Sequence, residues 1–563
     1  MKHDGERKVS IDTGAVPEPS AARVAGIPAL VSLFSFFYYL RHNDLLLYGD
    51  AVAHINIARR VFDSQTPGLL QLGTVWLPLP HLLTIPFILS KAMWQNGIGG
   101  SIPSMIAYVF GVVGIFRLVS GLLDTNPRTK PAAEVSAWAA AFAYGGNPNL
   151  IYMQATAMTE SIYLALFIWT VVYFAEFIRQ SSPRGENQIR PVLEREAKSP
   201  LMRCALCLAG AELTRYDGWF LAGVMGAVVV VATLRRWDDR ALRRAAIKFV
   251  LVIAAVPILW LAYNGTVYGN ALAFANGPYS ARAIEQRVGA PNPALHNVGV
   301  AAIFFLKSAQ LILADGNWGR FWLAAAILAV AISAWKLRAL SGALLLLWVP
   351  LPFYAISIAY GSVPVHVHTW WPFATFNQRY GLQLLPLFAI SAGALAASAF
   401  LLGARWRHSG KLVAIVFALM VVSDASVWRA SPLCLQEARK QWDVRNPLNS
   451  AIERLVARLP PNSRFLMDIG EHVGIMEQAG IPLRQVVNND NHRPWRQPSD
   501  PEGLWEHALA DPPRYVDFVI AFDGDAVDRS ANKTNLTELA EIHATGQPHA
   551  HIYATRSAPN QSR

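Results

Sequence analysis

The run ALSGALLLLWVPLPFYAISIAY at residues 339–360 contains no charged side chain, and neither does LQLLPLFAISAGALAASAFLL at residues 382–402. Apolar runs of about 20 residues are long enough to cross the hydrocarbon core of a bilayer as helices. The rest of the chain has a similar character, because 53% of its 563 residues are hydrophobic and only 15% are charged. This composition excludes an ordinary soluble globular protein and predicts an α-helical polytopic membrane protein.

Eleven segments in all are apolar enough to be predicted as transmembrane helices. They are residues 24–40, 101–122, 133–150, 156–178, 201–214, 219–234, 246–263, 320–336, 340–359, 381–402 and 411–429. Two other apolar stretches, 76–95 and 298–313, contain several prolines or a central lysine, which favours helices that lie at the outer membrane interface. We therefore expect about 11 transmembrane helices, the first of which stays as an anchor because no small-residue cleavage site follows it.

The net charge of +11 comes from basic residues that cluster between the apolar runs. With eleven spans, these clusters fall on the same side of the membrane as the polar segment 1–23. They are Arg179 to Lys198, Arg235 to Arg244, Lys336 with Arg338, and Arg405 with Arg407 and Lys411. Basic loops are favoured on the cytoplasmic side, so we expect an integral inner-membrane protein with a cytoplasmic N-terminus, and no binding of nucleic acid.

The predicted topology divides the chain into three parts: a cytoplasmic tail (1–23), a transmembrane domain (24–430) and a C-terminal segment (431–563). The external loops of the transmembrane domain are 41–100, 263–319 and 360–380. In the C-terminal segment, strand-like runs alternate with helix-like runs, which predicts a small extracytoplasmic α/β domain. The strand-like runs are Phe465–Ile469, Tyr515–Phe522 and His551–Thr555, and the helix-like runs are Pro447–Leu459 and Pro501–Ala510.

The first external loop holds the most informative polar residues. Asp50, His54 and Arg59 follow directly on the first predicted span. A helix that begins near Asp50 places Asp50 and His54 one turn apart on the same face. An aspartate at a helix start is also a common cap, but capping does not explain a polar cluster at the membrane surface. Ionisable groups at membrane depth are costly and usually functional.

These residues, followed by WLPLPH at 76–81, resemble the first external loop of the GT-C superfamily of membrane glycosyltransferases. That superfamily includes protein mannosyltransferases, aminoarabinose transferases and the catalytic subunits of oligosaccharyltransferases, which use polyprenyl-phosphate sugars or lipid-linked oligosaccharides. The resemblance covers roughly residues 24–430 and extends to TRYDGW at 214–219 and NQRY at 377–380. It implies a glycosyltransferase of the hexosyltransferase type, whose catalytic first-loop carboxylate is matched by Asp50. A second acidic residue of the family, at the start of the fourth span, is matched by Glu160.

The expected chemistry assigns a role to each of these residues. A sugar transfer from a polyprenyl phosphate needs a carboxylate to take the proton of the acceptor hydroxyl, and Asp50 is the candidate base. The donor phosphate needs cations, for which we expect the guanidinium groups of three arginines, with an adjacent tyrosine. These phosphate-binding candidates are Arg59, Arg215, Arg379 and Tyr380.

Two further residues have open roles. His54 either assists the base, binds a metal with Asp50 or makes a structural hydrogen bond. Glu160 either orders the acceptor, shares a divalent metal with Asp50 or caps its helix. The expected partners are a polyprenyl-phosphate sugar donor, a lipid, glycan or protein acceptor, and membrane lipids.

Two other functions fit the same topology. One is a transporter or flippase of lipid-linked sugars, which needs no catalytic carboxylate. The other is a non-catalytic envelope scaffold whose C-terminal domain binds a partner. The chain has no P-loop of the form G-x-x-x-x-G-K-[ST], which argues against nucleotide-driven transport.

Overall fold

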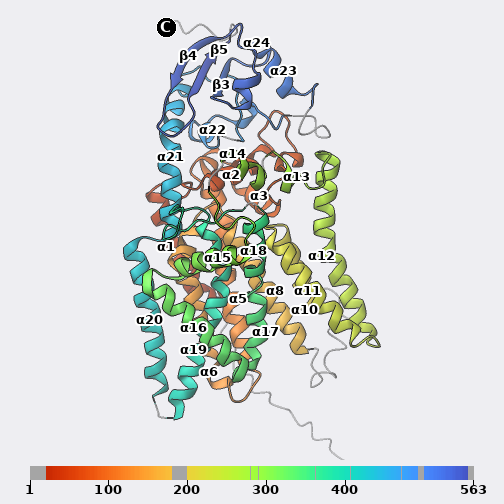
Figure 1. The fold of residues 1–563 in the computed structure, drawn as a ribbon, viewed down its shortest axis with the longest axis vertical. Helices are drawn as coiled ribbons and strands as arrows, with labels where there is room; N and C mark the ends of the chain where they lie inside the picture. The colour runs from red at the N-terminus through yellow and green to blue at the C-terminus, as the bar shows by residue number, and fades with distance from the viewer. Residues whose placement is uncertain are drawn as a thin grey trace, which may run out of the picture.

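In the computed structural model, the bundle of long helices carries a small α/β domain at one end (Figure 1). The structure describes residues 21–180, 200–278, 280–288, 291–361, 363–405, 408–470, 472–491 and 500–555. The tail 1–20, the basic residues Arg184 to Lys198 and Arg407 therefore lie outside the described residues.

Within those ranges, nine candidate spans are long and apolar enough to cross a membrane. They are formed by α1 (Ala21–Arg41), α5 (Ile98–Leu123), α8 (Glu160–Gln180), α11 (Asp217–Leu234), α12 (Arg240–Val267), α16 (Gly316–Trp335), the consecutive pair α17 (Arg338–Leu347) and α18 (Pro350–Tyr360), α19 (Leu385–Arg405) and α20 (Ser409–Ala430). The predicted polytopic helical fold is confirmed, with nine candidate spans in place of eleven.

The other two predicted spans are shorter helices. Segment 133–150 is divided between α6 (Lys130–Gly145) and α7 (Pro148–Met153), because the Asn147 side chain caps a new helix by accepting from the N–H groups of its first turn. The helix α6 has 16 residues, and the described part of α10 (Pro200–Glu212) has 13. Both pack along long neighbours, α6 against α5 and α19, and α10 against α8 and α12.

The two apolar stretches that were expected to lie at the interface are not among the nine candidate spans. Segment 76–95 is broken into α3 (Leu79–Thr84), the 3-10 turn η2 (Ile85–Phe87) and α4 (Lys91–Gln95). The segment 298–313 forms the single helix α15 (Val298–Leu313), which is too short to count as a span. Their depth in a membrane remains a prediction.

The segments that were expected to be external gather at one end of the bundle. The helices α2 (Gly49–Arg60), α3, α13 (Ala273–Asn276) and α14 (Ala281–Val288) all lie beneath the C-terminal domain (Figure 1). The long helix α21 (Leu433–Val456) leads from the top of α20 into that domain (Figure 1). The C-terminal end of α19, the N-terminal end of α20 and the turn between α11 and α12 lie at the opposite end of the bundle (Figure 1).

The C-terminal domain contains a five-stranded mixed sheet in the order β2-β1-β3-β5-β4. The strands β2 (Val486–Val487), β1 (Phe465–Leu466) and β3 (Phe518–Phe522) are parallel, and β5 (Ala550–Ala554) and β4 (Thr537–Ile542) continue the sheet antiparallel. Short helices complete the domain: α22 (Ile475–Gln478), α23 (Leu504–Ala510), α24 (Pro512–Tyr515) and α25 (Ala526–Ser530). The small α/β domain predicted from the sequence is confirmed, and its three predicted strands correspond to β1, β3 and β5.

The bundle and the domain share one buried apolar cluster. Its members include Tyr39 on α1, Phe305 on α15 and Phe518 on β3. Continuous burial of this kind fixes the domain over the end of the bundle, because separating them exposes apolar surface to water. The space enclosed between them is therefore set by the core packing.

Candidate active site

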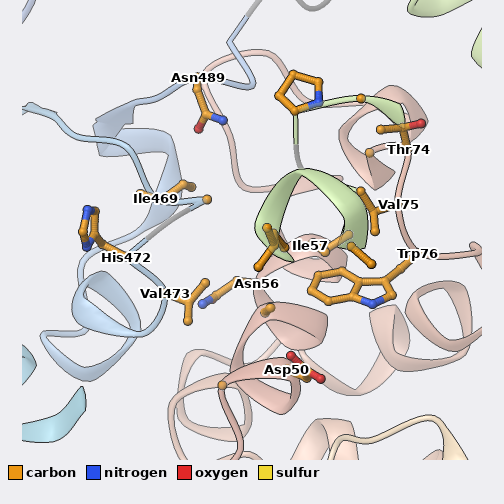
Figure 2. Close-up of a pocket in the computed structure, with 18 of the residues that line it drawn as sticks. Asp50, Asn56, Ile57, Thr74, Val75, Trp76, Ile469, His472, Val473 and Asn489 are labelled. Carbon is orange, nitrogen blue, oxygen red and sulfur yellow. The ribbon is translucent and has the colours of Figure 1, made fainter. Parts of the chain in front are cut away.

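A cavity of about 1240 Å³ lies where the C-terminal domain covers the bundle. Figure 2 shows Asp50 at one end of this cavity and Asn489, from the C-terminal domain, at the other. One wall is formed by the segment from Thr74 to Trp76, and the opposite wall by Ile469, His472 and Val473 (Figure 2). The cavity is therefore built jointly by the first external segment and the C-terminal domain.

Asp50 lies in the first turn of α2, the helix that was predicted to begin near it. Tyr48 occupies the N-cap position without a side-chain hydrogen bond, so Asp50 is not the cap. The Asp50 side chain is 41% exposed and forms an ion pair with Arg379. It is therefore the most accessible carboxylate of those that contact Arg379.

Arg379 lies at the start of the 3-10 helix η5 (Gln378–Leu384) and is almost completely buried. Each of its three nitrogens faces a different carboxylate. Nη2 contacts Asp50, Nε lies 3.3 Å from Glu160 Oε1, and Nη1 lies 3.5 Å from Glu437 Oε1. A planar guanidinium with donors in a fixed fork is suited to this arrangement.

Glu437 also orients the backbone that carries Arg379. Its carboxylate accepts from the N–H groups of Asn377 at 2.8 Å and Gln378 at 3.1 Å. Asn377 has a φ of +55°, which turns both N–H groups toward the carboxylate. Glu437 therefore holds Arg379 through its charge and through its contacts with the chain.

Behind Arg379 lies a second, deeper group of ion pairs. Arg215 places Nη1 3.4 Å from Glu160 and Nε 3.4 Å from Asp217, and donates to the Tyr354 hydroxyl at 2.8 Å. The ring of Tyr380 lies against both guanidinium groups, 5.2 Å from Arg379 and 5.0 Å from Arg215. Cation–π contacts of this kind fix the ring between the two charges.

Asp50, Glu160, Asp217, Glu437, Arg215 and Arg379 form what we call the ion-pair cluster. Four carboxylates face two guanidinium groups, which gives a formal charge of −2 when all are ionised. An added anion must therefore displace a carboxylate from a guanidinium or find one carboxylate protonated. Of the three carboxylates that contact Arg379, Asp50 can leave it at the lowest cost in free energy. The other two, Glu160 and Glu437, are buried and cannot move into water, whereas Asp50 is partly exposed.

The structure brings most of the predicted site residues together. Asp50, Arg379 and Tyr380 line the cavity. Glu160 and Arg215 do not line it, but contact Arg379 or Tyr380 from behind. The five residues come from distant parts of the chain and form one contiguous group.

His54 lies next to this group in a closed environment. Its Nδ1 lies 2.9 Å from Nε2 of His81, and its ring packs 4.7 Å from that of Trp76. Burial, and then the charges of Arg379 and Arg215, lower the pKa of His54 from 6.5 to about 3. Burial also lowers the pKa of His81 well below its usual range. The two imidazoles are therefore neutral at pH 7 and share one hydrogen bond.

Arg59 lies apart from the other predicted phosphate-binding residues. Its Nε donates to Asp63 at 2.7 Å, its Nη1 donates to the carbonyl of Ile88 at 2.6 Å, and its guanidinium stacks on Trp94. It does not line the cavity, whereas its neighbour Arg60 does and pairs with Asp490 of the C-terminal domain. Successive helical residues point about 100° apart, and here the side chain of Arg60 is the one directed to the cavity.

Several residues of the site were not predicted from the sequence, among them Asp217 of the ion-pair cluster, Glu437 and Arg60. Glu437 follows the last predicted span within the apolar context of LCLQE at 433–437, which is the pattern that singled out Asp50. Arg60 had the same local sequence context as Arg59, and only the direction of the helix face separates them. The sequence pattern that could have identified Glu437, an acidic residue directly after an apolar span, was present. No local pattern, however, indicates that Glu437 contacts Arg379.

A divalent metal shared by Asp50 and Glu160 does not fit the observed arrangement. Both carboxylates contact the guanidinium of Arg379, so a cation between them would lie beside a positive charge. In the part of the chain that the structure describes, close groups of three metal-binding side chains occur on the C-terminal sheet and not at these residues.

Comparison with solved structures identifies the fold. ArnT from Cupriavidus metallidurans, whose structure was determined with undecaprenyl phosphate bound, matches 96% of this chain and 100% of its own, with a TM-score of 0.55 and 13% identity. Oligosaccharyltransferase AglB from Archaeoglobus fulgidus, in complex with an inhibitory peptide and a dolichol-phosphate, matches 95% of this chain and 74% of its own, with a TM-score of 0.49 and 12% identity. No protein-family model and no curated protein matches the chain. The likeness to ArnT shows that this chain has the same fold as that protein, which agrees with the fold expected from the resemblance to the GT-C superfamily.

Proposed function

We propose that this protein is a membrane glycosyltransferase that transfers a sugar from a polyprenyl-phosphate donor to an extracytoplasmic acceptor, with Asp50 as the general base. The observation that carries this proposal is the pairing of Asp50 with Arg379 at the wall of a large cavity. A base and a phosphate-binding cation in direct contact are the two groups that this reaction needs side by side. The GT-C fold supports the same general kind of function.

The proposed reaction begins with an exchange of anions on Arg379. The donor phosphate takes the guanidinium face that Asp50 occupies, because the other two carboxylate partners of Arg379 are buried. Asp50 is then released next to the bound phosphate. The carboxylate becomes free to act as a base only when the donor is in place.

The transfer step is a displacement at the anomeric carbon of the sugar. The acceptor oxygen forms a bond to this carbon while the bond between the carbon and the phosphate oxygen breaks. Asp50 takes the proton of the acceptor hydroxyl, and the polyprenyl phosphate leaves with the bond electrons. Arg379 stabilises the phosphate charge that develops, with Tyr380 and Arg215 fixing its position.

The C-terminal domain supplies the other side of the proposed acceptor site. His472 belongs to the cavity wall opposite Trp76, and Asn489 lies at the end away from Asp50 (Figure 2). Burial lowers the pKa of His472 to about 4, so its imidazole is neutral at pH 7. Neutral hydrogen-bonding groups and an aromatic ring are suited to an acceptor that carries hydroxyl groups.

The orientation in the membrane follows from the same proposal. The C-terminal domain, which lines the cavity together with the first external segment, lies at the end of the bundle opposite to the turn that joins α11 and α12 (Figure 1). That turn carries Arg235 and Arg236, and basic turns are favoured in the cytoplasm. We therefore place the cavity outside an inner membrane and the N-terminus inside.

The test is transfer by the purified protein from a panel of radiolabelled polyprenyl-phosphate sugars, with and without a chelator. Asp50→Asn is expected to abolish transfer while the protein still binds undecaprenyl phosphate. Asp443→Asn, which changes an exposed aspartate on α21, is the matched control and is expected to keep wild-type transfer. Near wild-type transfer by Asp50→Asn would exclude Asp50 as the base. Movement of donor across proteoliposomes without release of sugar would instead identify a flippase.

A further inference from the structure

Three histidines and three carboxylates gather at one end of the C-terminal sheet. They are Asp523, Glu538, Glu541, His543, His549 and His551. None of them lines the cavity described above. Imidazole and carboxylate groups at this density form a candidate site for a transition metal.

The strand register and one tight turn bring these residues together. Glu541 on β4 lies directly opposite His551 on β5. The connecting turn contains Gly546, which has a φ of +73°, and is closed by a hydrogen bond from Gln547 N to Ala544 O of 3.1 Å. As a result, the rings of His543 and His549 lie 4.0 Å apart.

A backbone contact also fixes the position of His549. The N–H of Asp523, directly after β3, donates to the carbonyl of His549 at 3.0 Å. The turn is therefore tied to the neighbouring strand as well as to its own hairpin. The imidazole of His549 has a defined place relative to the end of β3 before any ligand binds.

The distances from Glu541 to His543 and His549 are longer than those of hydrogen bonds. His543 Nε2 lies 3.4 Å and His549 Nδ1 lies 3.7 Å from the same oxygen, Glu541 Oε1. Ordinary hydrogen bonds in proteins span about 2.7–3.2 Å between heavy atoms. Around a tetrahedral zinc ion with bonds of about 2.0–2.2 Å, adjacent ligand atoms are about 3.3–3.6 Å apart. The 3.4 Å distance falls in this range and the 3.7 Å distance lies just above it, and the three ligand atoms all lie within 4.8 Å of one another.

We propose that Glu541, His543 and His549 bind a zinc ion, through Oε1, Nε2 and Nδ1 respectively. Two imidazoles select against Ca²⁺ and Mg²⁺, which prefer oxygen ligands alone. Three protein ligands leave the fourth tetrahedral position to water, since the Glu541 and His543 side chains are about half exposed.

The remaining members of the group surround the three proposed ligands, and Asp523 Oδ2 lies 3.4 Å from Nδ1 of His549. His551 is held between Glu538 at 2.8 Å and Asp523 at 3.1 Å, so both of its ring nitrogens have carboxylate partners. The additional carboxylates make the local potential negative, which favours a divalent cation. Bound zinc links β4 to the β4–β5 turn and stabilises the C-terminal domain without contact with the cavity.

The test uses the full-length protein in detergent, freed of metal and of any histidine tag. Zinc sulfate is titrated calorimetrically, and bound zinc is counted by mass spectrometry after dialysis. The wild type is expected to bind one zinc ion that the double variant His543→Ala/His549→Ala lacks. His507→Ala, which removes an exposed histidine on α23 of the same domain, is the matched control and is expected to keep it.

A milder variant separates loss of the site from loss of the fold. Glu541→Gln keeps the shape of the side chain and is expected to weaken zinc affinity at least tenfold, since even outer-shell changes cost 10- to 100-fold. Its melting temperature without zinc is expected to match the wild type, while the rise in melting temperature on adding zinc becomes smaller. Equal zinc content in the wild type and the double variant would overturn the site, and so would unchanged affinity in Glu541→Gln.

Discussion

Replacing Arg379 by lysine tests the centre of the proposed site. The substitution keeps the positive charge and removes the planar guanidinium with its several hydrogen-bond donors. The guanidinium contacts three carboxylates with three different nitrogens, two of them at 3.3 and 3.5 Å. A lysine ammonium is a point charge on a flexible stem, so it cannot span carboxylates on three sides. Arg379→Lys therefore leaves at least one of the three carboxylates without its contact to residue 379.

The expected loss can be worked out from one charge-assisted hydrogen bond. Such a bond contributes about 1.5–3 kcal/mol, and every 1.36 kcal/mol is a factor of ten. If the donor phosphate loses one of the two hydrogen bonds of a bidentate contact, its affinity falls about 10- to 150-fold. Arg117→Lys is the matched control, because Arg117 pairs with Glu176 at a site where its side chain is 49% exposed. Exposed pairs contribute about 0–1 kcal/mol, so this control is expected to behave as the wild type.

The assay compares binding of undecaprenyl phosphate with binding of undecaprenol, which has the same chain and no phosphate. Arg379→Lys is expected to weaken binding of the phosphate and to leave binding of the alcohol unchanged. Equal loss for both lipids would mean that the substitution disturbs binding of the isoprenoid chain and not a phosphate contact. Unchanged affinity for undecaprenyl phosphate would refute the assignment of Arg379.

Four further outcomes are expected from the same geometry. Asp50→Asn removes the anion that competes for Arg379, so titration with undecaprenyl phosphate should show about two- to fivefold tighter binding, from a partly exposed pair of about 0.5–1 kcal/mol. Arg59→Gln breaks buried contacts outside the cavity, so the melting temperature should fall while affinity for undecaprenyl phosphate stays at the wild-type value. Glu437→Gln removes a buried charge beside Arg379, so the melting temperature and the transfer rate should both fall, as measured by thermal unfolding and by the radiolabel assay. The pKa of His54 is about 3 in the folded protein and about 6.5 in the unfolded chain. Between these pH values the unfolded chain binds more protons than the folded protein. The free energy of unfolding should therefore decrease as the pH falls through this window, by up to about 1.4 kcal/mol per pH unit. Thermal unfolding from pH 7 to pH 4 measures this slope, which should become shallower in His54→Gln.

Local sequence patterns predicted the parts of the fold that depend on local chemistry. The start of α2 near Asp50 was correct, because a polar helix after an apolar span has a clear periodic signal. The strand β4 was missed because its sequence, TELAEI, forms an exposed edge without the apolar alternation that marks a half-buried strand. Segment 133–150 was extended too far because its apolar composition hides the cap at Asn147.

The sequence identified single residues of the site from their local context, but it did not predict the contacts between them. Arg379 and Glu160 stand out as charges next to apolar runs, but their contact depends on packing between α8 and η5. Glu437 is separated from Arg379 by 58 positions and belongs to a different part of the predicted topology. Long-range pairing of this kind is decided by tertiary structure, which a single sequence does not reveal.

The position of Glu437 changes how the C-terminal part of the protein should be understood. It lies on α21, the helix that rises into the C-terminal domain, and it orients the backbone of Asn377 and Gln378 as well as the guanidinium of Arg379. If the C-terminal part were only a scaffold attached to an independent membrane enzyme, the ion-pair cluster would be complete without it. The cluster instead contains the buried carboxylate of Glu437 from this part. Because Asp50, Glu160 and Glu437 reach one arginine from α2, α8 and α21, the cluster is complete only when the first external segment, the bundle and α21 are docked together. The domain is therefore a structural part of the proposed reaction site, and its docking sets the geometry in which Asp50 meets the donor.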